Sequence, residues 1–482
     1  MATAPPTDPR AVTGPGIIAR IERLEGWSLS YKFIAIIGLG FLFTFYDIFD
    51  INVSFIQTCV DLKKGCTPET ALDSLPLPVV LNLVGYVVGT LVLSPVADKI
   101  GRRNMLLITM LITGLGSLYN AFAPDYPNFI IARIITGLGI GADLAIVNTY
   151  VNEVAPRKAR AKFTTLIFIN SALGALVGIW LGLILSTEKE DWPLGLPFAQ
   201  ASPSFDNGWR WMYGIGAILA LIAILLRFEL PESPRWLIGQ NRMDDADAIV
   251  RGMEQRAARR GALAEPDYDI PQEAVTPPSP VPYSTLFTNP LYRKRILLLF
   301  ALWFIGYITV YSYASGFTSV LSALKYPPPE AGVIAAVGSF GFVGMTILMT
   351  FIVELLERRY WLPIAAVVTL VGAFLIAAAG DTIAVAFIGS ILIFAGFNMW
   401  VSPTYAMSAE SFPTRARTSG FALVDGVGHV GGGIGVLAIA PVLPHMSTLG
   451  ALMLISCFLV IAAIIAQFTP HTRNRNLDHI SP

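Results

Sequence analysis

Long apolar runs recur along the whole chain and are separated by shorter polar segments. Each run is close to or above the roughly 20 residues that an α-helix needs to cross a bilayer. β-Strands are not expected, because an open sheet edge would leave backbone hydrogen-bonding groups unpaired in lipid. The pattern predicts an all-α membrane protein with twelve transmembrane helices. The expected spans are 32–57, 76–97, 104–122, 128–151, 163–186, 210–228, 295–322, 331–353, 361–380, 382–405, 417–440 and 447–468.

The longest polar stretch lies between the sixth and seventh runs and divides the helices into two sets of six. It holds a charged segment at 244–260, which we expect to be helical, and a proline-rich segment at 266–282. The N-terminal tail is also rich in proline, and we expect it to be disordered to about residue 15. The expected parts are a cytoplasmic tail (1–31), a six-helix half (32–228), a cytoplasmic central loop (229–292), a second six-helix half (293–468) and a cytoplasmic tail (469–482).

Basic residues cluster in alternate loops, which sets the orientation of the helices. Loops that carry an excess of lysine and arginine lie on the cytoplasmic side. Both termini are then cytoplasmic, and we expect an integral protein of the plasma membrane. The clusters are Lys99, Arg102 and Arg103; Arg157, Lys158, Arg160 and Lys162; Arg293, Lys294 and Arg295; Arg358 and Arg359; Arg415 and Arg417.

The composition excludes several classes of protein. The chain is 54% hydrophobic and 14% charged, whereas about a quarter of the residues in soluble domains are charged. The 33 basic and 33 acidic residues balance, so nucleic acid is not an expected partner. The start has no apolar segment of the kind found in signal peptides. No nucleophile with a base and no cluster of metal ligands stands out, so neither an enzyme nor a bound cofactor is predicted.

Two of the three cysteines, Cys59 and Cys66, fall in the first outer loop. Disulfides persist in oxidising compartments. The two residues should therefore be bridged if the exterior is oxidising, although spacing alone does not guarantee the required geometry.

The two halves repeat each other. DKIGRR at 98–103 is matched by ELLERR at 354–359, and EVAPRKAR at 153–160 is matched by ESFPTRAR at 410–417. Both matches fall in equivalent loops at nearly the same spacing. A duplicated six-helix unit predicts a substrate site at the midplane between the halves and transport by rocking of one half against the other.

Several motifs of these loops and helices identify a family. The chain resembles the major facilitator superfamily along all twelve helices, within the branch of sugar porters and phosphate- and metabolite:proton symporters. The resemblance implies two pseudo-symmetric halves, alternating access, protons as the coupling ion and a monomeric functional unit. The matching residues are Asp98, Gly101, Arg102 and Arg103; Arg133, Gly137, Gly139 and Gly141; Tyr150, Glu153, Ala155, Pro156 and Arg160; Pro231 to Trp236 (PESPRW); Glu410, Phe412, Pro413, Thr414 and Arg417.

Four charged residues inside the spans are the candidates for proton coupling. Asp47 and Asp50 lie three residues apart, and a carboxylate at membrane depth costs roughly 2.5–3.5 kcal/mol on insertion scales. Arg133 reaches a similar depth, so an ion pair with Asp47 is expected, and the resemblance implies that this is the coupling pair. Asp143 follows the glycines of the fourth helix, as an acid does in phosphate symporters. The alternatives are a structural ion pair and, for Asp143, an acid that only tethers its helix.

Charged residues at the inner ends of the helices are the candidates for a cytoplasmic gate. Carboxylates and guanidiniums there can form charge-assisted bonds across the two halves and close the inner side in an outward-open state. The alternative is that they only set topology. The candidates are Asp98, Arg102, Glu153, Arg160, Glu410 and Arg417.

The candidates for substrate binding lie on four helices. Trp303, Tyr307 and Tyr311 form a stripe at intervals of four on the seventh helix, and Asp425 and His429 share a face of the glycine-rich eleventh. An aromatic stripe and a lone histidine are also common in packed cores. The residues chosen are Asn170, Tyr307, Tyr311, Asn398, Tyr405, Asp425 and His429.

These observations predict a proton-coupled symporter for a small solute. The resemblance implies that sugar porters hold sugar with glutamines and asparagines on helices 5 and 7, and the seventh helix here has neither. Arg133 and a titratable His429 instead favour a small organic acid or another anion. A sugar or polyol:proton symporter, a proton-coupled exporter and a non-transporting nutrient sensor remain alternatives.

Overall fold

The computed structural model describes residues 9–24, 29–154, 160–261, 263–266, 268, 283–380, 382–412 and 420–473. Within these ranges twelve helices are long and apolar enough to span a membrane, which confirms the predicted class and number. They are Tyr31–Phe49, Ala71–Ile100, Arg102–Ala121, Tyr126–Val151, Leu166–Ser186, Gly208–Arg227, Pro290–Ala314, Pro328–Ile352, Arg358–Ala378, Ile383–Glu410, Ala422–Ile439 and Thr448–Ala466.

The first half of the membrane domain runs from α2 to α10. Its elements are α2 (Tyr31–Phe49), α3 (Ile51–Leu62), α4 (Ala71–Ser74), α5 (Pro76–Val88), the π-helix η2 (Gly89–Leu93), η3 (Ser94–Val96), α6 (Ala97–Ile100), α7 (Arg102–Ala121), α8 (Tyr126–Val154), α9 (Arg160–Ser186) and α10 (Gly208–Arg227).

The second half runs from α14 to α22. Its elements are α14 (Pro290–Ala314), α15 (Phe317–Ala323), α16 (Pro328–Ile352), η6 (Arg358–Tyr360), α17 (Trp361–Ala378), α18 (Ile383–Met399), α19 (Val401–Glu410), the π-helix η8 (Ala422–Gly426), α21 (Val427–Ile439), η9 (Leu443–His445) and α22 (Thr448–Ala466).

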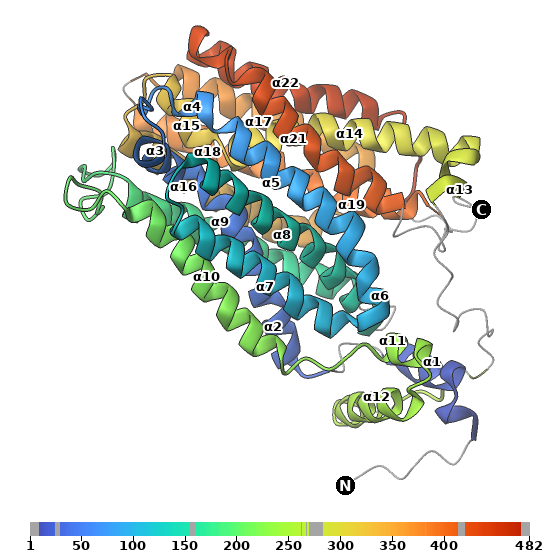
Figure 1. Ribbon diagram of the computed structural model, residues 1–482. Coiled ribbons are helices and arrows are strands. Elements are labelled where there is room, and N and C mark those ends of the chain that lie inside the picture. The colour runs from blue at the N-terminus through green and yellow to red at the C-terminus, as the bar shows by residue number, and fades with distance from the viewer. Residues whose placement is uncertain are drawn as a thin grey trace.

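The halves lie side by side, the first drawn blue to green and the second yellow to red (Figure 1). Helix α5 packs against α21 and α9 packs against α16, and these are the most extensive packings of one half against the other. The short helices η1 (Pro9–Val12), α1 (Gly14–Glu22), α11 (Pro234–Gly239) and α12 (Met243–Ala258) are outside the membrane helices, and α13 (Tyr283–Thr288) leads into α14. Helices α1, α11 and α12 gather at one end of the molecule (Figure 1).

The first helix of each half is interrupted at a similar position. Asp50 separates α2 from α3, and Ser315 with Gly316 separates α14 from α15. The sequence pattern predicted one continuous span in each place. The interruptions matter because they leave polar backbone groups available inside the protein, which is tolerated only where other protein groups satisfy them.

Glycines allow α8 to lie very close to its neighbours. A Cβ atom at Gly137 or Gly141 would stand 1.9 or 2.0 Å from a backbone oxygen of α5, and one at Gly139 would stand 2.7 Å from the backbone of α7. Any side chain at these positions would push the helices apart. The glycine run therefore holds α8, which carries Arg133 and Asp143, in the centre of the first half.

The N-terminal segment is structured from residue 9, which corrects the expectation of disorder to about residue 15. Thr13 caps α1, whose apolar residues are buried against α11 and α12. Arg20, also buried, donates to Asp247 at 2.6 Å and to Glu254 at 2.7 Å, both on α12. The cause of the error is that the stabilising partners lie more than two hundred residues away in sequence. The charged segment predicted to be helical does form α12.

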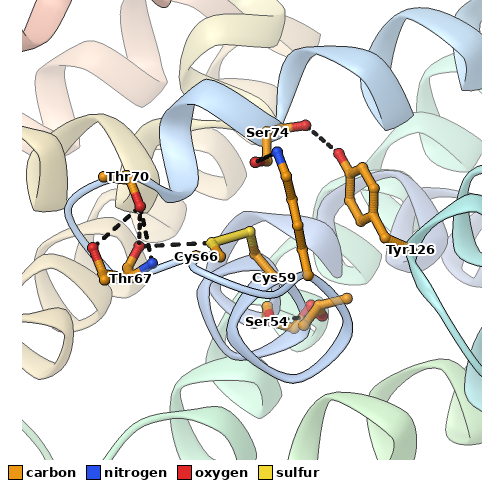
Figure 2. The surroundings of a disulfide bond; sticks show 9 residues. Ser54, Cys59, Cys66, Thr67, Thr70, Ser74 and Tyr126 are labelled. Carbon is orange, nitrogen blue, oxygen red and sulfur yellow. Dashed lines mark hydrogen bonds between the residues drawn. A yellow bond between two sulfur atoms is a disulfide. The ribbon is translucent and has the colours of Figure 1, made fainter.

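Cys59 and Cys66 are joined by a disulfide, with their Cα atoms 5.9 Å apart, which confirms the conditional prediction. Figure 2 shows the bond beside hydrogen bonds to Ser74, whose side chain accepts from Lys63 at 2.7 Å and whose carbonyl accepts from Tyr126. Cys59 is near the C-terminal end of α3, and α3 lies at the opposite end of the molecule from α11 and α12 (Figure 1).

Glu232 of the PESPRW motif caps the start of α7. Its carboxylate accepts the backbone N–H groups of Arg102 at 2.9 Å and Arg103 at 3.2 Å. Gly101, immediately before them, has a φ of 99°, and a Cβ atom there would stand 2.2 Å from the carboxylate. Burial raises the pKa of Glu232, and the backbone N–H groups oppose that shift. The motif thus ties the central loop to the loop between the second and third membrane spans.

We expect Glu232→Ala to lower the apparent melting temperature of the purified protein by several degrees. Two N–H groups at a helix start would lose their acceptor, and an unsatisfied buried group costs about 1–3 kcal/mol. Glu229→Ala is the matched control, because Glu229 pairs with Lys32 at the surface, where such pairs contribute little. Equal melting temperatures for the two variants would contradict the capping role.

Candidate functional site

Asp47, Asp50 and Arg133 form a buried charged cluster in the first half. All three side chains are buried. Arg133 Nη1 lies 3.3 Å from Asp50 Oδ1, and both terminal nitrogens of Arg133 donate to the backbone carbonyl of Asp47 at 3.3 Å. The guanidinium therefore holds the end of α2 through one carboxylate and one carbonyl oxygen.

The carboxylate of Asp47 points to a different neighbour. Ser117 of α7 donates to its two oxygens at 2.8 and 2.9 Å, and Gly216 of α10 leaves room for it. The expected side-chain pair of Asp47 with Arg133 is thus corrected: Arg133 pairs with Asp50. Residues three apart on a helix differ by about 60° in direction, which turns Asp50 toward α8 and Asp47 toward α7 and α10.

Asp143 forms an ion pair with Arg227, a residue that the sequence analysis missed. Arg227 of α10 forms two parallel bonds with it, at 2.5 and 3.0 Å, and neither side chain has any exposure. Thr109 donates to the same carboxylate at 2.8 Å, and Arg227 also donates to a backbone carbonyl of α7. The two charges balance and link α8, α7 and α10. This arrangement favours the alternative in which Asp143 tethers its helix, and its coupling role stays a prediction.

We expect Asp143→Asn to destabilise the protein by about 3–5 kcal/mol, because Arg227 would be left buried without a counter-charge. The double variant Asp143→Leu with Arg227→Met should recover most of that loss, since it removes both charges and keeps the volume apolar. Thermal unfolding in detergent measures both. If Asp143→Asn kept its melting temperature and lost only gradient-driven transport, Asp143 would be a coupling residue instead.

The substrate candidates of helices 7, 10 and 11 come together around Asp425. Tyr307 donates its hydroxyl to Asp425 Oδ1 at 2.6 Å, and the hydroxyls of Tyr307 and Tyr405 are 3.4 Å apart. His429 Nδ1 lies 2.8 Å from the backbone carbonyl of Asp425 and 3.7 Å from its carboxylate. The predicted shared face of Asp425 and His429 is thus confirmed.

Six aromatic side chains from both halves lie around Asp425 and His429. We call the set the aromatic cluster. Tyr86 of α5 stacks on the ring of His429, with ring centroids 4.2 Å apart. Tyr307 of α14 lies 4.1 Å from the same ring, centroid to centroid. Tyr86 belongs to the first half and the others to the second, so the cluster spans the boundary between the halves. Its members are Tyr86, Trp303, Tyr307, Tyr311, Trp400 and Tyr405.

The glycines of α21 bring that helix into contact with the rings. A Cβ atom at Gly428 would stand 2.7 Å from Trp303, and one at Gly432 would stand 2.3 Å from the ring of Tyr311. The close approach places Asp425 directly against α14.

Two of the predicted substrate residues lie elsewhere. Asn398 donates to the carbonyl of Phe342 at 3.0 Å and to Thr346 at 2.7 Å, so it joins α18 to α16. Asn170 donates to a carbonyl of its own helix and lies against Gly38 of α2. Neither has a hydrogen bond or ring contact to the aromatic cluster in the described part of the chain, and their substrate role stays a prediction.

The charged loops form networks within each half. Arg102 pairs with Asp98 at 2.6 Å and with Glu153 at 3.0 Å. In the second half Glu410 lies 3.5 Å from Arg358, which also pairs with Glu354. Among the residues whose side chains are described, these ion pairs lie within one half, and the predicted bonds across the halves stay a prediction. The side chain of Arg160 and the whole of Arg417 lie outside the described residues.

The halves are held together at the outer end by Asn52, two residues after Asp50. Its amide nitrogen donates to the carbonyls of Tyr313 and Ala314 at 2.8 and 2.7 Å, and its oxygen accepts from Thr318 at 2.8 Å. These carbonyls lie where α14 ends, so Asn52 satisfies the interrupted helix of the opposite half. These bonds cross the boundary between the halves, and we expect them to hold together the ends of the halves that carry the disulfide.

We expect Asn52→Ala to shift the protein toward an outward-open state, because these bonds form only when the outer ends meet. Spin labels at Glu69 and Val442, both exposed, on a Cys457→Ser background, would report longer distances in the variant. Asn128→Ala is the matched control, since Asn128 bonds only to Asp125 and Tyr119 within the first half. Unchanged distance distributions in Asn52→Ala would show that Asn52 does not hold the outer side.

The residues that the sequence analysis missed are Ser117, Arg227, Asn52, Tyr86 and Trp400. Arg227 and Asn52 carried a usable signal, because both are polar residues inside predicted apolar spans. Ser117, Tyr86 and Trp400 are ordinary residues of membrane helices, and only the packing of the helices gives them a role.

The comparisons with known proteins fit this architecture. The family model described as "Sugar (and other) transporter" matches residues 32–482. The chain belongs to this family of major facilitator transporters, and it is a membrane transporter and not an enzyme.

Relatives with different cargoes are similar over most of the chain. The niacin transporter NiaP of Acinetobacter baylyi is 25% identical over 480 residues, covering 96% of this chain and 99% of the relative. The 4-hydroxybenzoate transporter PcaK of Pseudomonas aeruginosa is 26% identical, covering 83% and 84%. The glucose transporter GlcP of Staphylococcus epidermidis is 26% identical, covering 93% and 96%.

Among solved structures, the xylose transporter XylE of E. coli in a partially occluded inward-open conformation has a TM-score of 0.71 at 20% identity, covering 92% of this chain and 99% of that one. A crystal structure of a D-xylose-proton symporter has a TM-score of 0.67 at 19% identity, covering 92% and 99%. At this identity the likeness establishes the fold, with its two six-helix halves.

Proposed function

We propose that this chain is a proton-coupled symporter that carries a small solute inward by alternating access. Family membership supports transport. The observation that carries the coupling proposal is the charge count at Arg133, where one guanidinium faces two buried carboxylates, Asp47 and Asp50. Two carboxylates with one counter-charge, away from water, favour one bound proton. No resident cofactor is needed for this cycle.

The proton site and the outer contact share one stretch of helix. Asp50 stands between α2 and α3, and Asn52 at the start of α3 holds the end of α14. When the proton leaves, the cluster carries a net negative charge, and the bonds that Arg133 makes to Asp50 and to the Asp47 carbonyl must adjust. That adjustment moves the base of α3, and with it the contact that closes the outer side.

The aromatic cluster is the proposed substrate site. It lies between the halves, as a site for rocking transport requires, and it joins Tyr86 of one half to His429 of the other. Stacked rings at 4–5 Å favour a solute with a flat or apolar face. The names of NiaP and PcaK specify ring-shaped aromatic acids and that of GlcP a sugar, and all of these solutes have such a face.

The organic-acid prediction has weaker support than the sequence suggested. It depended on Arg133 and His429 as positive charges in the cavity. Arg133 is engaged by Asp50 and the Asp47 carbonyl, and His429 stands beside the carboxylate of Asp425. An anion would meet Asp425 without a guanidinium to balance it. The anion stays a prediction for a ligand screen to decide.

An exporter and a nutrient sensor share this architecture and remain the alternatives. The orientation, with both termini and the loops of Arg102 and Arg358 in the cytoplasm, is supported by the disulfide of Cys59 at the opposite end. We propose the plasma membrane as the location and one chain as the functional unit. Flux of labelled solute in reconstituted vesicles of known orientation separates the classes, because a sensor gives none and an exporter gives the reverse direction.

The first experiment is a thermal-shift screen of the purified protein with nicotinate, 4-hydroxybenzoate, D-glucose and D-xylose, since a ligand of the folded state raises its stability. With a solute that binds, Asp47→Asn should abolish uptake driven by a pH gradient and spare exchange of labelled for unlabelled solute. The reason is that the amide cannot bind and release a proton. Asp125→Asn, at an exposed outer acid, is the control and should leave both intact. Gradient-driven uptake at the wild-type rate in Asp47→Asn would refute the coupling role.

A further inference from the structure

Asp425 is a buried acid of the membrane helices whose described neighbours include no arginine or lysine. Asp50 pairs with Arg133, and Asp143 pairs with Arg227. No arginine or lysine in the described chain forms an ion pair with Asp425; its polar neighbours are Tyr307, which donates to it, and His429. A buried carboxylate without a counter-charge is costly. Asp425 therefore differs from Asp50 and Asp143, each of which faces a guanidinium.

The surroundings of Asp425 are those that stabilise a positive charge. The faces of aromatic rings attract cations, and a cation near several rings and out of water gains about 2 kcal/mol or more from one good contact. The imidazole of His429 already shows that a flat nitrogen ring fits here, since it lies between Tyr86 and Tyr307 at 4.2 and 4.1 Å. The Nδ1 atom of His429 lies 2.8 Å from the backbone carbonyl oxygen of Asp425 and 3.7 Å from its carboxylate.

A second unsatisfied polar group belongs to the aromatic cluster. Trp400 has no exposed surface, and its indole N–H has no hydrogen-bond acceptor among the described residues. Its ring lies 4.9 Å from Trp303 and 6.1 Å from Tyr307, centroid to centroid. Buried N–H groups are normally paired. A ligand that carries a hydrogen-bond acceptor as well as a positive charge would satisfy both Trp400 and Asp425.

We infer that the solute of this transporter is a small organic cation with a flat nitrogen-containing group and a hydrogen-bond acceptor. Asp425 supplies the counter-charge, the aromatic cluster holds the flat face, and Trp400 donates to the acceptor. This inference rests on the proposed function only in taking the bound molecule to be the transported one. Binding itself is tested at equilibrium, in detergent and without a gradient, so a failure here is separate from a failure of proton coupling.

The probes are three molecules with the same ring and different charges: 1-methylnicotinamide, a cation; nicotinamide, which is neutral; and nicotinate, an anion. Dissociation constants are measured by calorimetry on the purified full-length protein. We expect 1-methylnicotinamide to bind about tenfold or more tightly than nicotinamide, in keeping with one desolvated cation–aromatic contact. Nicotinate should bind more weakly than both. Tighter binding of nicotinate, or no preference for the cation, would overturn the inference.

Substitutions test which residue produces the preference for 1-methylnicotinamide over nicotinamide. Asp425→Asn should remove the advantage of the cation over nicotinamide, and Asp125→Asn should retain it. Tyr307→Phe keeps the ring beside Asp425 and removes only the hydroxyl, so its preference for the cation should persist. This variant also serves if Asp425→Asn fails to fold, because a cation preference lost in Tyr307→Phe would assign the selectivity to the hydroxyl and overturn the role of Asp425. Cation preference that persists in folded Asp425→Asn would overturn it as well.

Discussion

A charged side chain inside a bilayer needs a counter-charge or a change of protonation, and this constraint organises the N-terminal six-helix half. Arg133 and Arg227 each hold a carboxylate on another helix, and the glycines of α8 make the close approach possible. The charges of Asp143 and Arg227 balance and both side chains are fully buried, which suits a permanent structural link between α8 and α10. The Arg133 cluster has one carboxylate too many, and the imbalance gives it the means to respond to protons.

The second half repeats the helix pattern without repeating the charges. Its first helix is interrupted like that of the first half, yet the interruption at Ser315 and Gly316 is satisfied by Asn52 from across the boundary. The acid of its interior, Asp425, is met by phenol and imidazole and by no guanidinium. The two halves thus share a scaffold, and the proposed proton site lies in the first half while most of the proposed solute site lies in the second.

Asn52 connects these proposed sites to the conformational cycle. It lies two residues from Asp50, and its bonds to α14 are available only when the outer ends of the halves are together. In the proposed cycle, a change in the protonation of the Arg133 cluster acts on the start of α3 and so on the contacts of Asn52. At the other end of the molecule, the described ion pairs of Arg102 with Glu153 and of Arg358 with Glu410 each lie within one half.

The sequence alone determined the fold class, the number of spans and the duplication, and it identified Cys59 and Cys66 as candidates for a disulfide, because periodicity and motif spacing are local or nearly local properties. It did not determine that Arg133 pairs with Asp50, that Asn398 lies away from the aromatic cluster, or that α1 docks on α12. Those outcomes depend on helix rotation and on contacts between residues far apart in the chain. Only the packing of twelve helices decides which face meets which neighbour.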